Sequence, residues 1–288
     1  MKLPYCTGFL GLARKLRDKH TARVTVVPVP FEATTSFGTG TVYGPNAIIS
    51  ASQQVEFWDE QLQKEPCSIG IYTAPPVFAR DDWTQTAQCL TQTAYSLAQK
   101  EKFPLFLGGE HSISAPIVKG MAKKYKDITV LHLDAHADLR DEYMGLKSSH
   151  ACVMRRIFDM NIPFCSVAIR SLSHEEHELI IRHKLNILYA HQIREDKNWM
   201  EQIIGKLGEH IYITFDIDAV DISEVRATGT PEPGGLLWQD IMSFFEKLSL
   251  SGKKVVGADL VELAPQVNDR VSSFYAARLA YKMIAYFA

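Results

Sequence analysis

Six side chains of the types that bind divalent metal ions come directly after three apolar runs of the sequence. They are His111, Asp134, His136, Asp138, Asp216 and Asp218. Within this set, the segments DAHAD and DID place potential ligands at alternate positions. Alternate residues of an extended backbone point to the same side, so each segment is expected to present its ligands together. If the apolar runs are parallel strands, all six side chains meet at the carboxyl ends of the strands, where ligands bind in open α/β sheets.

Each of these residues also has a structural explanation when it is taken alone. One Asp after a strand commonly caps a helix or forms a turn, and one His after two glycines commonly belongs to a turn. The six together are harder to explain in this way, because four carboxylates brought close together without a cation would repel one another. Carboxylates favour Mg and Mn, imidazole favours later metals, and manganese satisfies both preferences. Because six ligands exceed what a single four-coordinate zinc takes, we predict two Mn²⁺ ions per chain.

Five segments of the chain resemble motifs of the ureohydrolase family, which includes the arginases and agmatinases, and they occur in the family's order. They are GGEHS, DAHAD, TFDIDAVD, TGTPEPGG and GADLVELAP. The resemblance extends from residue 35 to residue 279 and implies a bridged pair of Mn ions. It implies that one ion takes His111, Asp134, Asp138 and Asp216. It implies that the other takes His136, Asp134, Asp216 and Asp218.

The resemblance also implies roles for Glu262 and His150. Glu262, in the segment LVELAP, matches the family's guanidinium-binding glutamate, and a carboxylate can hold a guanidinium through two parallel hydrogen bonds. Without the resemblance it would be taken for a solvent-facing residue at the end of a strand. His150 matches the histidine that passes protons to the leaving amine, although alone it would look like a residue near a helix start. The reaction implied is attack of water on a guanidinium carbon, aided by cations that lower the pKa of water.

The loop 139–149 bears on the choice of the guanidino substrate. Arginases recognise the amino-acid end of arginine through an Asn- and Ser-bearing loop, whereas this loop has no Asn and resembles that of bacterial and archaeal agmatinases. Asp141 and Glu142 are expected to contact the ammonium group of agmatine, or else to face the solvent. The substrate expected first is therefore agmatine, cleaved to putrescine and urea.

Several positions depart from the family pattern and leave other substrates open. They are Ala151, Cys152, Ile222, Ser272 and Ser273. The alternatives within the family are aminopropylagmatine, guanidinobutyrate and arginine. A single-zinc deacylase of the related deacetylase fold would need one DxH pair and one further Asp, so the additional carboxylates of Asp138 and Asp218 argue against it. An inactive polyamine-binding relative would be expected to have lost ligands, yet all six are present.

The elements that must position these residues alternate between apolar strands and helices. Strands are expected at Val24–Val29, Ser68–Tyr72, Phe103–Leu107, Ile128–Leu133, Phe164–Ile169, Asn186–Tyr189, Ile211–Phe215 and Lys254–Val261. Helices are expected at Pro45–Gln53, Trp83–Lys100, Ile113–Lys124, Ala151–Asp159, His174–Arg182, Trp199–Leu207, Trp238–Leu250 and Ser273–Phe287. Continuous apolar runs are typical of strands covered on both faces. The pattern predicts a three-layer α/β/α arrangement with a mostly parallel eight-stranded sheet, the arginase-like fold, in a single domain over residues 1–288.

Composition excludes several classes of partner. Of the 288 residues, 46% are hydrophobic and 22% charged, with a net charge of −2, which is ordinary for a globular chain with a sizeable core. Because the sequence has no run of about five like charges and no stretch of about 18 consecutive apolar residues, neither nucleic acid nor a membrane is expected as a partner. The segment 1–23 lacks the apolar core of a signal peptide. The five cysteines, including Cys6, form no CxxC pair, so we expect a cytoplasmic protein without a disulfide framework. The family resemblance implies a homo-oligomer, trimeric or hexameric.

Overall fold

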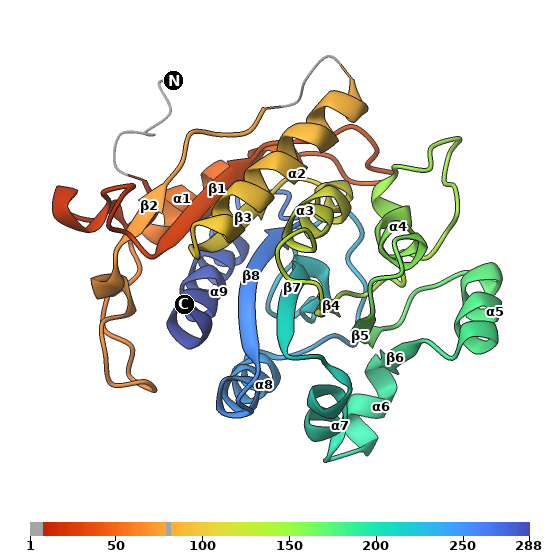
Figure 1. Ribbon diagram of the computed structural model, residues 1–288. Helices are drawn as coiled ribbons and strands as arrows, with labels where there is room; N and C mark the ends of the chain where they lie inside the picture. The colour runs from red at the N-terminus through yellow and green to blue at the C-terminus, as the bar shows by residue number, and fades with distance from the viewer. Residues whose placement is uncertain (1–7, 79–81) are drawn as a thin grey trace.

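A computed structural model describes residues 8–78 and 82–288 of the chain. In these residues, eight parallel strands form one sheet, in the order β2-β1-β3-β8-β7-β4-β5-β6 (Figure 1). Helices cover both faces of this sheet, so the predicted α/β/α arrangement is confirmed. Cys6 and the beginning of the segment 1–23, on which the expectation about a signal peptide rests, lie outside the described residues. No helix in the described part of the chain is both long and apolar enough to cross a membrane.

The strands agree closely with the apolar runs of the sequence. They are β1 (Val24–Val29), β2 (Ile71–Thr73), β3 (Phe103–Gly108), β4 (Ile128–Leu133), β5 (Phe164–Ile169), β6 (Asn186–Tyr189), β7 (His210–Asp216) and β8 (Lys254–Val261). One prediction was wrong in its bounds, because residues 68–70 do not belong to a strand. Pro66–Ile69 form a 3-10 helix that begins at the proline, and Gly70 follows with a φ of 84°, so β2 starts only at Ile71.

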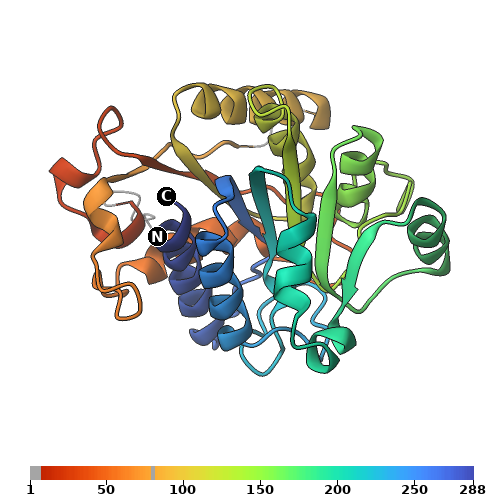
Figure 2. The same ribbon diagram turned by 60° about the horizontal axis from the view of Figure 1, so that its bottom comes forward.

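The helices form two layers. They are α1 (Gly44–Ser52), α2 (Trp83–Gln99), α3 (Ser114–Met121), α4 (Val153–Asp159), α5 (His174–His183), α6 (Ala190–Glu195), α7 (Trp199–Lys206), α8 (Trp238–Leu250) and α9 (Val271–Phe287). Helices α2 to α5 cover one face of the sheet, and α1 with α6 to α9 cover the other (Figures 1 and 2). The sequence did not predict α6, whose six residues bury only Ala190 and Ile193 and so give too short a helical pattern to recognise. The predicted helix 113–124 was also too long, because α3 ends at Met121.

The core explains why the strands are continuously apolar. Within β4, Leu131 and Leu133 pack into the cluster beneath α1 and α6 to α9, whereas Ile128 and Val130 pack into the cluster beneath α2 to α5. Because both faces of the sheet are covered, alternate residues are buried on opposite sides and neither set can be polar without a partner.

The order of the strands places a crevice at the centre of the sheet. β3 and β4 are successive strands of the chain, yet β8 and β7 separate them in the sheet. Where connections diverge in this way, the carboxyl ends of the neighbouring strands leave room for a ligand. The predicted site residues follow these central strands.

Candidate metal centre

His111 lies at the centre of the first group of predicted ligands. It begins a 3-10 turn directly after β3 and is 1% exposed. Its Nδ1 atom lies 3.1 Å from Oδ2 of Asp134 and 3.2 Å from Oδ2 of Asp138. Oδ2 of Asp216, at the end of β7, lies 3.4 Å from the same nitrogen. None of these contacts has the geometry of a hydrogen bond, so a buried ring nitrogen is left facing three carboxylates.

His136 organises a second group that adjoins the first. Its Nδ1 atom lies 2.9 Å from Oδ2 of Asp218 and 3.5 Å from Oδ1 of Asp134. Asp134 therefore divides its two oxygens, with Oδ2 toward His111 and Oδ1 toward His136. The structure thus brings all six predicted ligands together, and Asp134 has the position expected of a bridging carboxylate.

The crowding of charges shifts the protonation of the cluster. Burial, followed by the charges of Asp218 and Asp134, raises the pKa of Asp216 well above its ordinary value. Burial and the charge of Asp134 also raise the pKa of Asp138. Burial alone would lower the pKa of His136, but Asp218 and Asp134 outweigh it and raise the pKa to about 12. Divalent cations between these groups would relieve the repulsion among the carboxylates.

The donor set fits a pair of divalent metal ions. Carboxylate oxygens are hard ligands and imidazole nitrogens are intermediate ones, while no cysteine belongs to either group within the described residues. The unpartnered Nδ1 atom of His111 supplies a lone pair where three carboxylates converge. The His111 group and the His136 group would each hold one ion, with Asp134 shared between them.

A row of buried polar side chains lies beneath the metal centre. Ser166, His132, Thr214 and Asp259 are register partners across β5, β4, β7 and β8, and each is 0% exposed. The Thr214 hydroxyl lies 2.9 Å from Nε2 of His111 and donates to Oδ1 of Asp259 at 2.7 Å. Because the hydroxyl hydrogen is used toward Asp259, Nε2 of His111 is the donor in the contact with Thr214. The lone pair of Nδ1 is then free to face the carboxylates.

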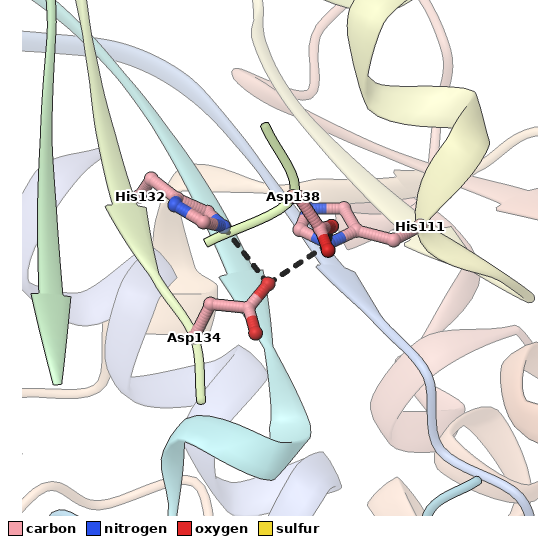
Figure 3. Close-up of side chains that lie close together, drawn as sticks. All are labelled: His111, His132, Asp134 and Asp138. Carbon is pink, nitrogen blue, oxygen red and sulfur yellow. Dashed lines mark hydrogen bonds and ion pairs between the residues drawn. The ribbon is translucent and has the colours of Figure 1, made fainter. Parts of the chain in front are cut away.

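His132 contacts the Asp134 carboxylate from the other side. Its Nε2 atom lies 2.8 Å from Oδ2 of Asp134, and its Nδ1 atom lies 3.0 Å from the Ser166 hydroxyl. Figure 3 shows the rings of His132 and His111 directed at the same carboxylate group. His132 is not among the residues that the sequence predicted for the site. Its signal was a histidine inside an otherwise apolar strand, directly before the predicted ligands.

Glu262 connects β8 to the loop after β3. Its Oε1 atom accepts a hydrogen bond of 2.6 Å from the backbone N–H of His111, and its own N–H donates to the carbonyl of Gly109. Glu262 has a φ of 63°, in the left-handed region that non-glycine residues rarely adopt. Gly109 is required where these loops meet, because a Cβ there would lie 1.9 Å from the carbonyl oxygen of Phe31. Burial, opposed by the bond from His111, raises the pKa of Glu262 well above its ordinary value.

His150 is held by residues that the sequence did not indicate. Its N–H donates to the Thr34 hydroxyl at 3.0 Å, and its Nδ1 atom lies 3.2 Å from the same oxygen. Thr34 in turn donates to Oε1 of the buried Glu110 at 2.7 Å, so Thr34 can only accept from Nδ1. Nε2 of His150 is therefore the nitrogen that can take up and release a proton, and it lies 3.4 Å from the Ser36 hydroxyl. Glu110 belongs to the GGEHS motif, but its link to His150 depends on Thr34, a residue distant in sequence.

A cavity of about 310 Å³ connects these groups. It is lined by five of the six predicted ligands together with His150 and Glu262, and its volume is at the small end for a ligand pocket. Asp141 and Glu142 are not among the described residues that line it. Asp141 instead accepts a hydrogen bond of 2.6 Å from Arg156, and Glu142 is exposed. Substrate contact by these two residues stays a prediction.

Comparison with known proteins gives consistent matches over nearly the whole chain. The sequence model of the arginase family matches residues 22–285. The chain is 38% identical over 273 residues to the N(1)-aminopropylagmatine ureohydrolase of Synechocystis sp., with 92% of this chain and 89% of that protein covered. It is 34% identical over 248 residues to the agmatinase of Bacillus cereus, with 85% and 84% covered. The crystal structure of the agmatine ureohydrolase of Thermoplasma volcanium superimposes with a TM-score of 0.86 at 30% identity, covering 94% of this chain and 91% of that one.

Proposed function

Because the chain belongs to the arginase family of ureohydrolases, we propose that it hydrolyses a guanidino compound with an amine at its far end. Agmatine, giving urea and putrescine, is the substrate that the loop 139–149 favours. N(1)-aminopropylagmatine, giving urea and a longer polyamine, is a second candidate, because a relative named for that activity is 38% identical. Both substrates present the same guanidinium to the site and a cation at the other end.

The observation that carries the proposal is that Glu262 lines the same cavity as five of the six predicted metal ligands. Its Oε1 atom accepts from His111, while Oε2 has no partner within the described residues. A carboxylate retains several acceptor positions after one hydrogen bond. Glu262 can therefore hold a guanidinium while its link to His111 fixes that guanidinium beside the cluster.

The residues of the chain divide the reaction between them. Two divalent cations, held by the His111 and His136 groups and proposed to be Mn²⁺, would supply Lewis acidity. They would lower the pKa of water, so that hydroxide is available at neutral pH. Glu262 positions the guanidinium carbon for the oxygen of that water. The water oxygen bonds to this carbon and releases a proton, the bond from the carbon to the substituted nitrogen breaks, and the departing amine takes up a proton in place of that bond. His150, whose Nε2 atom can take up and release a proton, is the residue that we propose to deliver it.

A urea-release assay with Mn²⁺ tests the proposal directly. The substrates are agmatine, N(1)-aminopropylagmatine, arginine and 4-guanidinobutyrate, all at matched metal content. We expect kcat/KM for one of the two amine substrates to exceed that for arginine and guanidinobutyrate by about 10-fold or more. A preference for arginine or guanidinobutyrate would overturn the proposed substrate class while leaving the family unchanged.

A further inference from the structure

Glu232 is a carboxylate in the wall of the cavity that none of the interactions described so far uses. It lies between Pro231 and Pro233, lines the same cavity as Glu262, and is half-buried. Within residues 8–78 and 82–288, no side chain donates a hydrogen bond to its carboxylate or forms an ion pair with it. The charge of Arg170 acts on the Glu232 carboxylate from nearby, but no side chain among the described residues occupies its acceptor positions, which stay available to a ligand in the cavity.

The other charges of the cavity have partners. Two divalent cations would balance four carboxylates of the metal centre. These are Asp134, Asp138, Asp216 and Asp218. Glu262 would balance the guanidinium of the substrate. Glu232 is the remaining carboxylate among the described lining residues, apart from Glu176, which already has partners.

The guanidinium of Arg140, a positive charge in the cavity wall, also has partners. Its Nε atom lies 3.8 Å from Oε2 of Glu176, and its guanidinium carbon lies 5.2 Å from the centre of the Tyr143 ring. Glu176 also accepts a hydrogen bond of 2.9 Å from the N–H of Leu139, which fixes it beside Arg140. The positive charge of Arg140 is therefore already paired with these groups, so it would bind a carboxylate at the end of a substrate only weakly.

Arg170 fixes the loop of Glu232 to the metal centre. Its Nη2 atom donates to the backbone carbonyl of Glu232 at 2.8 Å and to that of Asp218 at 2.7 Å. Two further hydrogen bonds from Arg170 go to the carbonyls of Pro233 and Ala168. Because these four hydrogen bonds all go to backbone oxygens, Arg170 positions the loop and leaves the Glu232 carboxylate with its acceptor capacity. The flanking prolines stiffen the loop further.

We propose that Glu232 recognises the cationic far end of the substrate, and so selects amine-ended over carboxylate-ended guanidino compounds. This inference rests on the proposed function, which it deepens by assigning the choice of substrate to one residue. Glu262 and the metal centre would hold the part that all guanidino substrates share. Glu232 would attract an ammonium group and repel a carboxylate at the other end.

The test compares Glu232→Gln with wild type on agmatine and 4-guanidinobutyrate, whose far ends carry opposite charges. We expect kcat/KM for agmatine to fall about 10-fold, mainly through KM, as for one charged contact in a partly exposed site, with guanidinobutyrate unchanged or improved. Glu232→Lys should reverse the preference. Calorimetric binding of 1,4-diaminobutane to the Mn-loaded protein, a readout independent of turnover, should weaken by a similar factor in Glu232→Gln.

Two matched variants serve as controls. Glu195→Gln removes the same charge from an exposed position on α6 that does not line the cavity, so it should change neither substrate. Equal losses on both substrates in Glu232→Gln, or unchanged binding of the diamine, would overturn the inference. A selective loss in Glu142→Gln without one in Glu232→Gln would also overturn it and assign recognition to the loop 139–149. If wild type released no urea from either amine, the proposed function would be wrong. The binding of the diamine would still test whether Glu232 recognises a cationic group.

Discussion

The hydroxyl of Thr214 lies 2.9 Å from Nε2 of His111 and determines which nitrogen of that ring faces the carboxylates. The Thr214 hydroxyl donates its own hydrogen bond to Asp259, its register partner on β8. Thr214 and Asp259, neither of which is a predicted ligand, therefore orient the histidine at the centre of the candidate metal site. Interactions of this kind fix the tautomer and the direction of a ligating ring.

We expect Thr214→Val to weaken binding of the ion in the His111 group by about 10- to 100-fold. Valine has nearly the same shape but cannot accept the hydrogen bond from Nε2 of His111. Thr214→Ser, which keeps the hydroxyl, should bind the ion like wild type. The measurement is titration of metal into the apoprotein against a competing chelator, and equal affinities of the Val and Ser variants would refute the role of this hydrogen bond.

Asp134 should affect both ions, because its two oxygens face different histidines. We predict that Asp134→Asn lowers the content of both ions, whereas Asp138→Asn, whose carboxylate contacts His111, lowers chiefly one. Elemental analysis after dialysis against a fixed free Mn²⁺ concentration measures both. One ion retained at full occupancy in Asp134→Asn would show that this carboxylate does not bridge.

The sequence predicts the ligands of this site better than the residues that hold them. The ligands follow apolar strands at alternate positions, so extended geometry and parallel pairing are enough to bring them together. The contact between Thr214 and Asp259 requires the register of β7 against β8, which local patterns do not determine. A polar residue inside an apolar strand was the available signal for Thr214, Asp259 and His132.

The backbone of the site was also beyond the sequence pattern. Asp138 and Glu262 have φ values of 53° and 63°, a conformation that sequence reasoning assigns to glycine. Tertiary contacts impose it, since Glu262 is bonded on both its N–H and its carboxylate to the loop after β3. Asp141, which lies outside the cavity lining, is likewise held by a tertiary contact, its ion pair with Arg156.

Glu262→Gln should lower kcat/KM for every substrate by about 10- to 100-fold, because it replaces a charged contact with the guanidinium by a neutral one. The amide oxygen of glutamine can still accept the hydrogen bond from His111, so the loop after β3 should keep its position. Steady-state kinetics on agmatine and guanidinobutyrate measure the loss. A loss confined to one of them would show that Glu262 reads the far end instead of the guanidinium.

Asp221 should make the loop of Glu232 sensitive to acid. Burial raises its pKa, but hydrogen bonds from Ser223, Gly234 and Gly235 outweigh this and lower the pKa to about 2, from 3.8. A lowered pKa stabilises the folded chain above pH 3.8, and this contribution is lost as the pH falls toward 2. Because the loop is partly exposed, we expect Asp221→Asn to cost about 1 kcal/mol at neutral pH.

Denaturant unfolding at a series of pH values checks the sign of the Asp221 effect. The difference in unfolding free energy between wild type and Asp221→Asn should be largest at neutral pH and shrink below pH 3.8. A difference that stayed constant down to pH 2 would mean that Asp221 acts through shape and not through its charge.

Thr34 should govern the proton transfer that we assign to His150. Thr34→Val removes both the acceptor for Nδ1 of His150 and the link to Glu110. Without them the ring can adopt the other tautomer, so we expect kcat to fall by about 10-fold or more. KM and metal content should not change, since Thr34 contacts none of the predicted ligands in the hydrogen bonds and ion pairs of the described residues.

Thr34→Ser separates this role from a purely structural one. Serine restores the hydroxyl between His150 and Glu110, so kcat should return close to the wild-type value, whereas a loss due to packing of the threonine methyl would persist. Nitrogen NMR of the His150 ring gives a second readout, because the two tautomers shift Nδ1 and Nε2 in opposite directions. We expect hydrogen on Nδ1 in wild type and Thr34→Ser, and a mixture of tautomers in Thr34→Val. The same ring spectrum in all three proteins, together with equal kcat for the Ser and Val variants, would show that Thr34 does not position His150.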